Sequence, residues 1–319
     1  MRFSVIGAGG IGCYYAARLI EAGHEVTLVA RGEHLQAMQR DGLSVNHPEL
    51  RFKKTVTAYA TDEWLAQTEP SQVDVVIVCL KGMQTELFAQ QLGIWCERYK
   101  AQRLPLVLSL QNGVENEKHL ADTLPKGLVV GGIARRIGAH IVRPGVVDAV
   151  GPAQVIFGLW PNQQEVNSTQ LASINALAEC FNQALIPTEV SADINKELWR
   201  KLMVNNGFNP ICTLLQIETG EVASLPTLAP LIKGAMNEAA LAARADGVVF
   251  TLEEVEEMFE LISTFDSIKP SMLIDREKGR PLEIEEICGV VIRGCEQLGK
   301  DAPYNRCIAT LLDLALAQK

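Results

Sequence analysis

Residues 2–31 read RFSVIGAGGIGCYYAARLIEAGHEVTLVAR, and this stretch decides the fold of the first half of the chain. The short apolar run at its start, Arg2–Ile6, predicts a buried strand. Residues 11–22 predict a helix, and residues 25–30 predict a second strand. A strand, a glycine-rich turn, a helix and a strand in this order are typical of the first βαβ unit of a parallel sheet.

The glycines between the first strand and the helix follow a G-x-G-x-x-G pattern. Gly7 permits the tight turn, Gly9 lets the backbone approach a pyrophosphate, and Gly12 lets the helix pack closely on the strand. The first turn of the helix offers N–H groups and the positive end of its dipole to phosphates. We therefore predict that a dinucleotide cofactor binds the whole loop, which consists of Gly7, Ala8, Gly9, Gly10, Ile11 and Gly12.

The end of the second strand predicts which dinucleotide binds. A site for NAD usually has Asp or Glu about 20 residues past the glycines, where its carboxylate accepts a hydrogen bond from the ribose 2′-hydroxyl. This chain has Ala30 and Arg31 there, so no carboxylate ends the strand. The Arg31 guanidinium can pair with a 2′-phosphate through a forked, charge-assisted contact. NADP(H) is therefore favoured over NAD(H), and an exposed loop arginine without a ligand is the alternative.

Polar residues follow two further predicted strands, residues 73–80 (VDVVIVCL) and 106–110 (LVLSL). Near-continuous apolar runs of this length are typical of central parallel strands that are covered on both faces. Lys81 follows the first run, and Asn112, within Gln-Asn-Gly, follows the second. Parallel sheets bind ligands at the carboxyl ends of their strands, so both residues are candidates for the cofactor site. A solvated lysine and a simple Asn-Gly turn are the alternatives.

The rest of the chain divides by its pattern into two parts. Short β-rich pieces between residues 129 and 160 predict antiparallel strands that extend the sheet, and after about residue 190 the strand signals end. Other predicted helices are residues 85–96, 170–184, 196–208, 228–245, 252–265 and 284–298, with a short helix near the C-terminus and a strand at 186–190. The expected fold class is α/β: a Rossmann-type dinucleotide-binding domain at residues 1–190, then an all-helical domain at residues 191–319.

Composition limits the class of protein. The 319 residues suit two domains, and 48% hydrophobic with 21% charged residues is ordinary for a globular protein. The net charge of −9 argues against nucleic acid or an anionic membrane as a partner. No apolar run approaches the roughly 18 residues that span a bilayer, and the first ten residues already carry a fold motif rather than a signal peptide. The eight cysteines form no Cys-x-x-Cys pair, and Cys288 and Cys295, one heptad apart, suit buried thiols better than a metal site. A cytoplasmic protein without a metal is expected.

The segment ELWRKLMVNNGFNP, residues 197–210, is the strongest candidate for chemistry in the helical part. Lys201, Asn205 and Asn209 are spaced four residues apart, which places them on one face of a helix. Asparagine is a poor helix former, and polar groups on an apolar helix need partners when they are buried. One ammonium and two amides in a row suit a polar ligand. The alternative is that Lys201 is solvated and that Asn209 ends the helix before Pro210.

Taken together, these motifs resemble the ketopantoate reductase family (2-dehydropantoate 2-reductases) over essentially the whole chain. Three features in combination are diagnostic: the glycine motif, the Lys-x-x-x-Asn-x-x-x-Asn helix, and a Ser…Glu pair formed by Ser271 and Glu283. The matching stretches are GAGGIG at 7–12, CLK at 79–81, QNG at 111–113, the stretch from Gly-Ala at 138–139 to Pro-Gly at 144–145, WRKLMVNNGFNP at 199–210, PSM at 270–272 and LEIEEICG at 282–289.

The resemblance implies NADPH-dependent reduction of 2-dehydropantoate to (R)-pantoate, a step toward pantothenate and coenzyme A. It implies that Lys201 is the general acid, which is chemically reasonable because an ammonium both polarises the C2 carbonyl oxygen and supplies its proton. Glu283 is expected near this lysine and the nicotinamide ribose. By the same resemblance, the substrate-binding residues are Asn112, Asn205, Asn209 and Ser271, and the cofactor-binding residues beyond the glycine loop are Arg31, Lys81, Asn112, Ala139 and Glu283.

One departure from the family pattern leaves more than one 2-oxo acid as a candidate substrate. Many family members have Asn before Gly-Glu in the loop after the catalytic helix, and this chain has Thr219, whose side chain is shorter and has fewer donors. A second hypothesis is therefore a reductase of another branched or bulky 2-oxo acid. A third is a non-catalytic NADP(H) sensor, against which the complete polar helix argues.

None of the five histidines is given a role; His24, His34 and His47 are expected in or near surface turns. The apolar helical part would support a homodimer.

Overall fold

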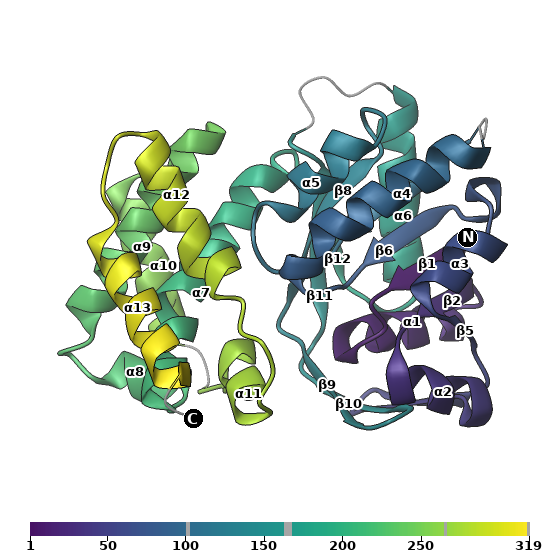
Figure 1. Cartoon of the computed structure of the whole chain (residues 1–319), viewed down its shortest axis with the longest axis horizontal. Coiled ribbons are helices and arrows are strands. Elements are labelled where there is room, and N and C mark those ends of the chain that lie inside the picture. Colours follow the sequence, from purple (N-terminus) through teal and green to yellow (C-terminus); the bar gives the residue numbers. More distant parts are fainter. Residues whose placement is uncertain (100–102, 163–167, 265–266, 318–319) are drawn as a thin grey trace. The chain divides into compact units, whose positions relative to one another are not determined.

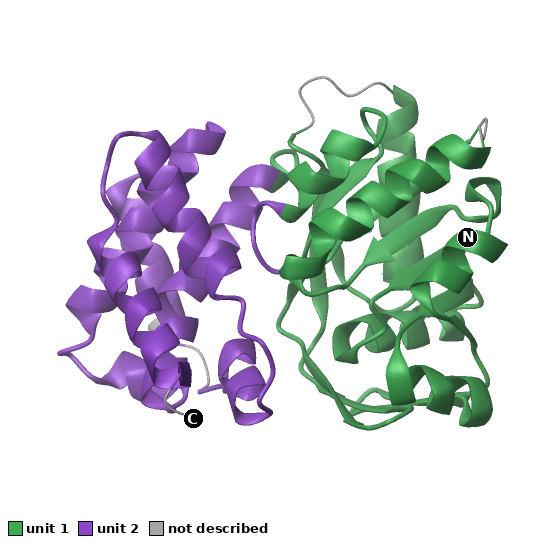
Figure 2. Cartoon of the chain, viewed as in Figure 1, with its two compact units in different colours: residues 1–111, 116–194 green, residues 112–115, 195–319 purple. Residues whose placement is uncertain are grey.

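The computed structural model describes residues 1–99, 103–162, 168–264 and 267–317. The chain forms two compact units, which are coloured separately in Figure 2. Unit 1 consists of Met1–Gln111 and Asn116–Ile194, and unit 2 consists of Asn112–Glu115 and Asn195–Lys319. The chain therefore passes from unit 1 into unit 2 at Asn112 and returns to unit 1 at Asn116.

Unit 1 is built on an eight-stranded sheet with the strand order β12-β11-β8-β7-β6-β1-β2-β5. The six strands from β8 to β5 are parallel, whereas β11 pairs antiparallel with β8 and β12 pairs parallel with β11. The predicted parallel strands are thus confirmed. The predicted antiparallel extension is confirmed for β11, whereas β8 itself pairs parallel with β7. The strands are β1 (Arg2–Ile6), β2 (Glu25–Val29), β5 (Thr57–Tyr59), β6 (Val75–Val78), β7 (Leu106–Ser109), β8 (Val129–Arg135), β11 (Gln154–Leu159) and β12 (Thr188–Val190).

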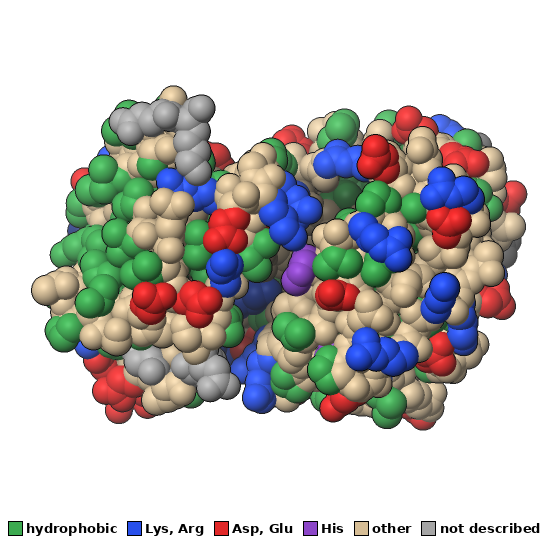
Figure 3. Space-filling model, turned by 90° about the horizontal axis from the view of Figure 1, so that it is seen from below, with side chains coloured by type: hydrophobic (Ala, Val, Ile, Leu, Met, Phe, Trp, Pro, Cys, Tyr) green, Lys and Arg blue, Asp and Glu red, His purple; other side chains and the backbone are tan. Residues whose placement is uncertain are grey.

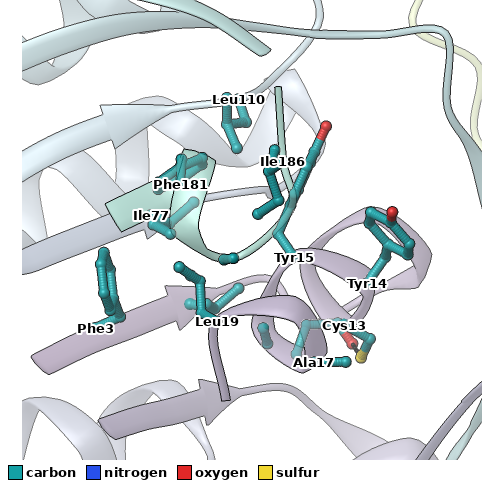
Figure 4. Close-up of a cluster of buried hydrophobic side chains, with 14 of the residues drawn as sticks. Phe3, Cys13, Tyr14, Tyr15, Ala17, Leu19, Ile77, Leu110, Phe181 and Ile186 are labelled. Carbon is teal, nitrogen blue, oxygen red and sulfur yellow. Dashed lines mark hydrogen bonds between the residues drawn. The ribbon is translucent and has the colours of Figure 1, made fainter. Parts of the chain in front are cut away.

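Helices cover both faces of this sheet (Figure 1). Because successive side chains of a strand point to opposite faces, Ile77 packs in one hydrophobic cluster and Val76 in the other. On one face, Tyr15 of α1 and Phe181 of α6 pack over the strands (Figure 4). On the other face lie Trp64 of α3 and parts of α4 and α5. The helices of unit 1 are α1 (Gly10–Glu21), α2 (Gly32–Asp41), α3 (Thr61–Gln67), α4 (Thr85–Tyr99), α5 (Asn116–Thr123) and α6 (Ser168–Gln183).

A second, four-stranded sheet with the order β4-β3-β10-β9 corrects one expectation. The β-rich pieces between residues 129 and 160 do not all extend the main sheet, because β9 (Gly138–Arg143) and β10 (Val146–Val150) leave it. They join a hairpin that the sequence had not indicated, β3 (Leu43–His47) with β4 (Leu50–Lys54). The parallel pairing of β10 with β3 holds the two hairpins together. These four strands form a small sheet beside α1.

All the regular secondary structure that the structure describes in unit 2 is helical, as predicted. Its central helix, predicted for residues 228–245, buries side chains along most of its length, among them Ile232 and Met236. One π-helical turn, Glu285–Gly289, precedes α12. The C-terminal helix is 15 residues long rather than short. The helices are α7 (Ile194–Leu215), α8 (Thr219–Ser224), α9 (Ala229–Ala242), α10 (Leu252–Ser263), α11 (Ser271–Glu277), α12 (Val290–Gln297) and α13 (Pro303–Ala317).

The surface carries charges of both signs. On the face shown in Figure 3, basic and acidic side chains are interspersed, and they form no extended patch of one sign. None of the helices among the described residues is long and apolar enough to cross a membrane. The eight cysteines are unpaired, and the predicted burial of Cys288 and Cys295 is confirmed. Within the described ranges, no cluster of three His, Cys, Asp or Glu side chains is placed to hold a metal ion.

Candidate functional site

The glycine-rich loop is hydrogen-bonded to the end of the neighbouring strand β2. The backbone N–H groups of Gly7 and Ala8 both donate to the carbonyl of Val29, at 3.0 and 2.8 Å. Gly7 has a φ of +88°, and a Cβ there would lie 2.8 Å from backbone atoms of Cys79 and Leu80 at the end of β6. Only glycine satisfies both demands. The loop is therefore held in place by β2 and β6.

The start of α1 offers an open, uncapped helix end. Gly9 is the N-cap of this helix, and no side chain caps it. A Cβ on Gly9 would meet no neighbour nearer than the Gly7 carbonyl oxygen, at 3.9 Å. At Gly12, by contrast, a Cβ would lie 2.7 Å from that oxygen and 3.1 Å from Val5, so this glycine serves close packing. Free space at the positive end of a helix fits a phosphate group.

Gly10 has a packing role that sequence reasoning missed. A Cβ at this position would lie 2.2 Å from the carbonyl oxygen of Ala139 and 2.6 Å from the backbone nitrogen of His140, both on β9. The start of α1 therefore abuts the second sheet, and any side chain at Gly10 would separate them. The pattern in the sequence could not reveal this because nothing in it placed β9 beside α1.

Arg31 is exposed and is the N-cap residue of α2, two residues after the end of β2. His34, on the first turn of α2, is half-buried rather than in a surface turn, and its Nδ1 accepts a hydrogen bond from the N–H of Gly145 at 3.0 Å. The expectation for His47 is also wrong. This residue ends β3 with 3% of its surface exposed, and its Nε2 lies 2.7 Å from the Gly151 carbonyl oxygen. Both rings were expected at the surface because the second sheet was not predicted.

The polar residues that follow β6 and β7 differ in role. Lys81 is half-buried and follows β6 as expected. After β7, however, Gln111 is buried, and its Nε2 donates to the Leu80 carbonyl at 3.0 Å and to the Thr85 hydroxyl at 2.7 Å. Gln111 thus ties the ends of β6 and β7 together, a structural role that was not predicted. Asn112, the next residue, is half-buried and belongs to unit 2.

An arginine within unit 2 holds the segment that carries Asn112. Arg293 of α12 donates to Glu115 at 2.7 Å through Nη2 and to Glu285 of the π-helical turn at 2.9 Å through Nη1. Burial raises the pKa of the neighbouring Glu286, and the charges of Glu283 and Glu285 add to this effect. The π-helical turn is therefore an acidic segment that one arginine joins to the Asn112 loop.

The polar row of α7 lies on a continuous helix. Lys201 and Asn205 are half-buried, and Asn209 is buried with 7% exposed. The alternative that Asn209 ends the helix is wrong, because α7 runs through Pro210 to Leu215. Proline normally breaks a helix by removing one backbone hydrogen bond.

Tertiary contacts stabilise this longer helix. The guanidinium of Arg276 on α11 donates to the carbonyls of Thr213 and Leu214 and so caps the end of α7. The same contact docks α11, which begins at the exposed Ser271, onto α7. Glu283, with 5% exposed, comes just before the π-helical turn. Unit 2 therefore contains Lys201, Asn112, Asn205, Asn209, Ser271 and Glu283, and unit 1 contains the glycine loop, Arg31, Lys81 and Ala139.

Asn206, next to the polar row, was not assigned a role from the sequence. Its side chain is fully buried and donates through Nδ2 to the Ile287 carbonyl at 2.9 Å and to the Asn305 side chain. It therefore fastens α7 to the π-helical turn and to α13. The pair Asn205-Asn206 was the signal that could have found it, because adjacent positions of a helix face different directions.

Comparison with known proteins identifies the family. Residues 3–162 match the sequence model of "Ketopantoate reductase PanE/ApbA", and residues 193–315 match "Ketopantoate reductase PanE/ApbA C terminal". The chain belongs to the ketopantoate reductase family. The family that the motifs indicated, and the Rossmann-type unit followed by a helical unit, are both confirmed.

Relatives of this family match along the full length. A 2-dehydropantoate 2-reductase of Archaeoglobus fulgidus is 30% identical over 98% of this chain and 96% of its own. The crystal structure of 2-dehydropantoate 2-reductase from Geobacter metallireducens is 29% identical, covers 99% of this chain and 100% of its own, and has a TM-score of 0.83. A D-mandelate dehydrogenase, solved with NADH and anilino(oxo)acetate, shares the fold with a TM-score of 0.87 at 24% identity, over 100% of this chain and 99% of its own.

Proposed function

We propose that this family member reduces 2-dehydropantoate to (R)-pantoate with NADPH, and so serves pantothenate and coenzyme A synthesis. The observation that carries the proposal is the row Lys201, Asn205 and Asn209 on one uninterrupted helix. The proposal assigns cofactor binding to the Rossmann-type domain, residues 1–190, and substrate binding with proton donation to the helical domain, residues 191–319. The names of relatives such as the Archaeoglobus fulgidus protein support the reaction.

The chain's own residues have defined tasks in this reaction. The chemistry that NADPH supplies when bound is a hydride for the C2 carbon of the 2-oxo acid. Lys201 polarises the C2 carbonyl oxygen with its ammonium group and then donates a proton to that oxygen, which yields the 2-hydroxy acid. Asn112, Asn205, Asn209 and Ser271 bind the polar groups of the substrate. Glu283 is assigned a place close to Lys201 and the nicotinamide ribose.

The cofactor assignment rests on unit 1. Free space beside Gly9 at the uncapped end of α1 fits the pyrophosphate. Exposed Arg31, at the start of α2, supports recognition of the 2′-phosphate and therefore NADPH over NADH. The proposed cofactor set is the glycine loop, Arg31, Lys81 and Ala139 of unit 1, together with Asn112 and Glu283 of unit 2. Eight unpaired cysteines support a cytoplasmic location, and we expect a homodimer formed through the helical unit.

Replacing Lys201 tests the mechanism. We expect Lys201→Ala to lower kcat by about 10²–10⁴-fold, because the carbonyl oxygen loses its proton donor, while NADPH still binds. Steady-state oxidation of NADPH and a fluorescence titration of NADPH measure the two effects. Lys196→Ala is the matched control, because Lys196 lies on the same helix and pairs with Glu254 at 2.8 Å. Near-normal turnover of Lys201→Ala would refute the mechanism, and a wild-type protein that binds NADPH but reduces no 2-oxo acid would support the sensor hypothesis.

Thr219 favours a second candidate, a reductase of another branched or bulky 2-oxo acid. Its hydroxyl donates to the Ile268 carbonyl at 3.1 Å, and the Ile268 N–H donates back to the hydroxyl at 3.0 Å. This side chain is therefore engaged in holding the start of α8, where many family members carry Asn. We expect kcat/KM for 2-dehydropantoate to exceed that of every other acid in a panel of branched 2-oxo acids, measured with NADPH. A clear lead by another acid would establish the second candidate.

A further inference from the structure

The segment around Arg31 is attached to the glycine loop at both of its ends. Before Arg31, the Val29 carbonyl accepts hydrogen bonds from the N–H groups of Gly7 and Ala8. After Arg31, the ring of His34 lies against the start of α1: its Nε2 is 3.5 Å from the Sγ of Cys13, and this thiol donates to the Ala8 carbonyl of the same loop. Arg31 therefore lies between two attachments to the loop that is proposed to bind the pyrophosphate.

The contacts of His34 define which of its ring nitrogens carries the proton. The Gly145 N–H lies 3.0 Å from Nδ1, and an N–H group can only donate, so Nδ1 is the unprotonated acceptor. The proton of a neutral ring is then on Nε2, the nitrogen on the side of Cys13. Nε2 lies 3.5 Å from the Sγ of Cys13, whose thiol donates to the Ala8 carbonyl at 3.2 Å.

The surroundings of His34 favour this neutral ring. Burial lowers the pKa of His34, although the carbonyl of Ala8 acts in the opposite direction. The ring also lies on the first turn of α2, where the positive end of the helix dipole disfavours a cation. The thiol of Cys13 is buried, and burial raises its pKa, so it contributes no negative charge that would favour protonation of the ring.

We propose that His34 is a positioning residue for the cofactor. Its neutral ring joins the start of α2 to the glycine loop through the thiol of Cys13, and to the turn between β9 and β10 through Gly145. It thereby fixes Arg31 where this residue meets the 2′-phosphate. His34 acts through Arg31 and touches no reacting atom. This inference rests on the proposed binding of NADPH and adds a residue that sets the preference for the phosphorylated cofactor.

Three substitutions distinguish a role of His34 in positioning Arg31 from a role in packing alone. His34→Leu fills similar space without donor or acceptor. We expect it to raise the Kd for NADPH about tenfold, since the hydrogen bond from Gly145 and the polar contact with Cys13 are both lost. The Kd for NADH should change less, so the preference for NADPH falls. His34→Gln retains one acceptor and one donor and should keep both Kd values within about threefold. In the background of Arg31→Ala, His34→Leu should have no further effect on NADPH, because neighbours that act together are not additive.

The experiment is a fluorescence titration of NADPH and NADH at pH 7.5 for the wild type and these variants, with thermal unfolding as a check on folding. His24→Gln is the matched control, because burial lowers the pKa of His24 too and the residue lies beyond the opposite end of α1. A second measurement uses the wild type alone. Nitrogen-15 NMR of its histidines should show His34 neutral, with the proton on Nε2.

The possible results are distinct. The expected pattern is a loss of NADPH preference in His34→Leu, its rescue in His34→Gln and no change in His24→Gln. A folded His34→Leu with an unchanged ratio of the two Kd values overturns the inference alone, and so does an NMR spectrum with a charged ring or an Nδ1 proton. If His34→Leu does not fold, the NMR spectrum and the His34→Gln titration decide. A wild type that binds neither nucleotide overturns the proposed function and this inference with it.

Discussion

Gly9 and Gly10 are adjacent glycines at the start of α1 that serve different purposes. A Cβ on Gly9 would point into open space, and a Cβ on Gly10 would lie 2.2 Å from a backbone oxygen of β9. A flexible side chain could move away from such a contact, whereas the backbone of a paired strand cannot easily do so. The first glycine is thus available for a ligand, and the second is required by the fold.

Alanine substitutions should separate these two roles. We expect Gly10→Ala to lower the free energy of unfolding by about 1–3 kcal/mol, because overpacking forces α1 away from β9. Gly9→Ala should leave this free energy within about 0.5 kcal/mol of wild type and should weaken NADPH binding, because the methyl group occupies the space proposed for the phosphate. Urea unfolding and an NADPH titration measure both effects. Equal stability of Gly10→Ala and wild type would contradict the assigned packing role.

The helices of unit 2 are joined by a buried carboxylate. Glu238 on α9 accepts hydrogen bonds from the backbone N–H groups of Tyr304 and Asn305, at 2.9 Å each, and from the Asn305 side chain at 2.9 Å. Those N–H groups belong to the first turn of α13, which has no partner for them within its own helix. A negative charge there also interacts favourably with the helix dipole. Glu238 therefore holds the C-terminal helix against the centre of the unit.

Neutralising this carboxylate should destabilise the protein. We expect Glu238→Gln to lower the free energy of unfolding by about 2–3 kcal/mol, because the hydrogen bonds to a charged acceptor are weakened and an amide donor is turned toward other donors. Glu260→Gln, at an exposed position of α10, should change it by less than about 0.5 kcal/mol. Urea denaturation followed by circular dichroism gives both values. If Glu238→Gln and Glu260→Gln have the same free energy of unfolding, the Glu238 carboxylate does not stabilise the attachment of α13.

Elements with strong local signals could be predicted from the sequence, and those that depend on distant partners could not. The first βαβ unit and the polar face of α7 have patterns that a few consecutive residues define. Strand β4 (LRFKK) alternates buried and exposed side chains over only a few residues before Lys53 and Lys54, which are both exposed. The other half of its sheet comes from β9 and β10, far along the chain, so the short local pattern was not enough to predict this sheet. The continuation of α7 past Pro210 depends on Arg276 from another helix. The site was predictable where a motif is local, and Gln111, Asn206 and His34 were missed because their partners lie elsewhere in the sequence.

At the scale of the whole molecule, the net charge of the protein has the same sign as the charge of its proposed ligands. The net charge is −9, and the expected ligands, a dinucleotide and a 2-oxo acid, are anions. Their proposed binding therefore depends on local groups such as Arg31, Lys81, Lys201 and the amides at the start of α1, and not on attraction by the surface as a whole. The interspersed charges on the face in Figure 3 agree with this distinction.

The contact of Gly10 with Ala139 also has a consequence for synthesis of the chain. A ribosome releases the chain from its N-terminus, so residues 2–31 leave it long before β9 and β10. The glycine loop is therefore synthesised before β9, and Gly10 meets the backbone of Ala139 only after residues 138–150 have emerged and have paired in the second sheet. The loop that is proposed to bind the dinucleotide is thus translated well before the strand against which the start of α1 packs.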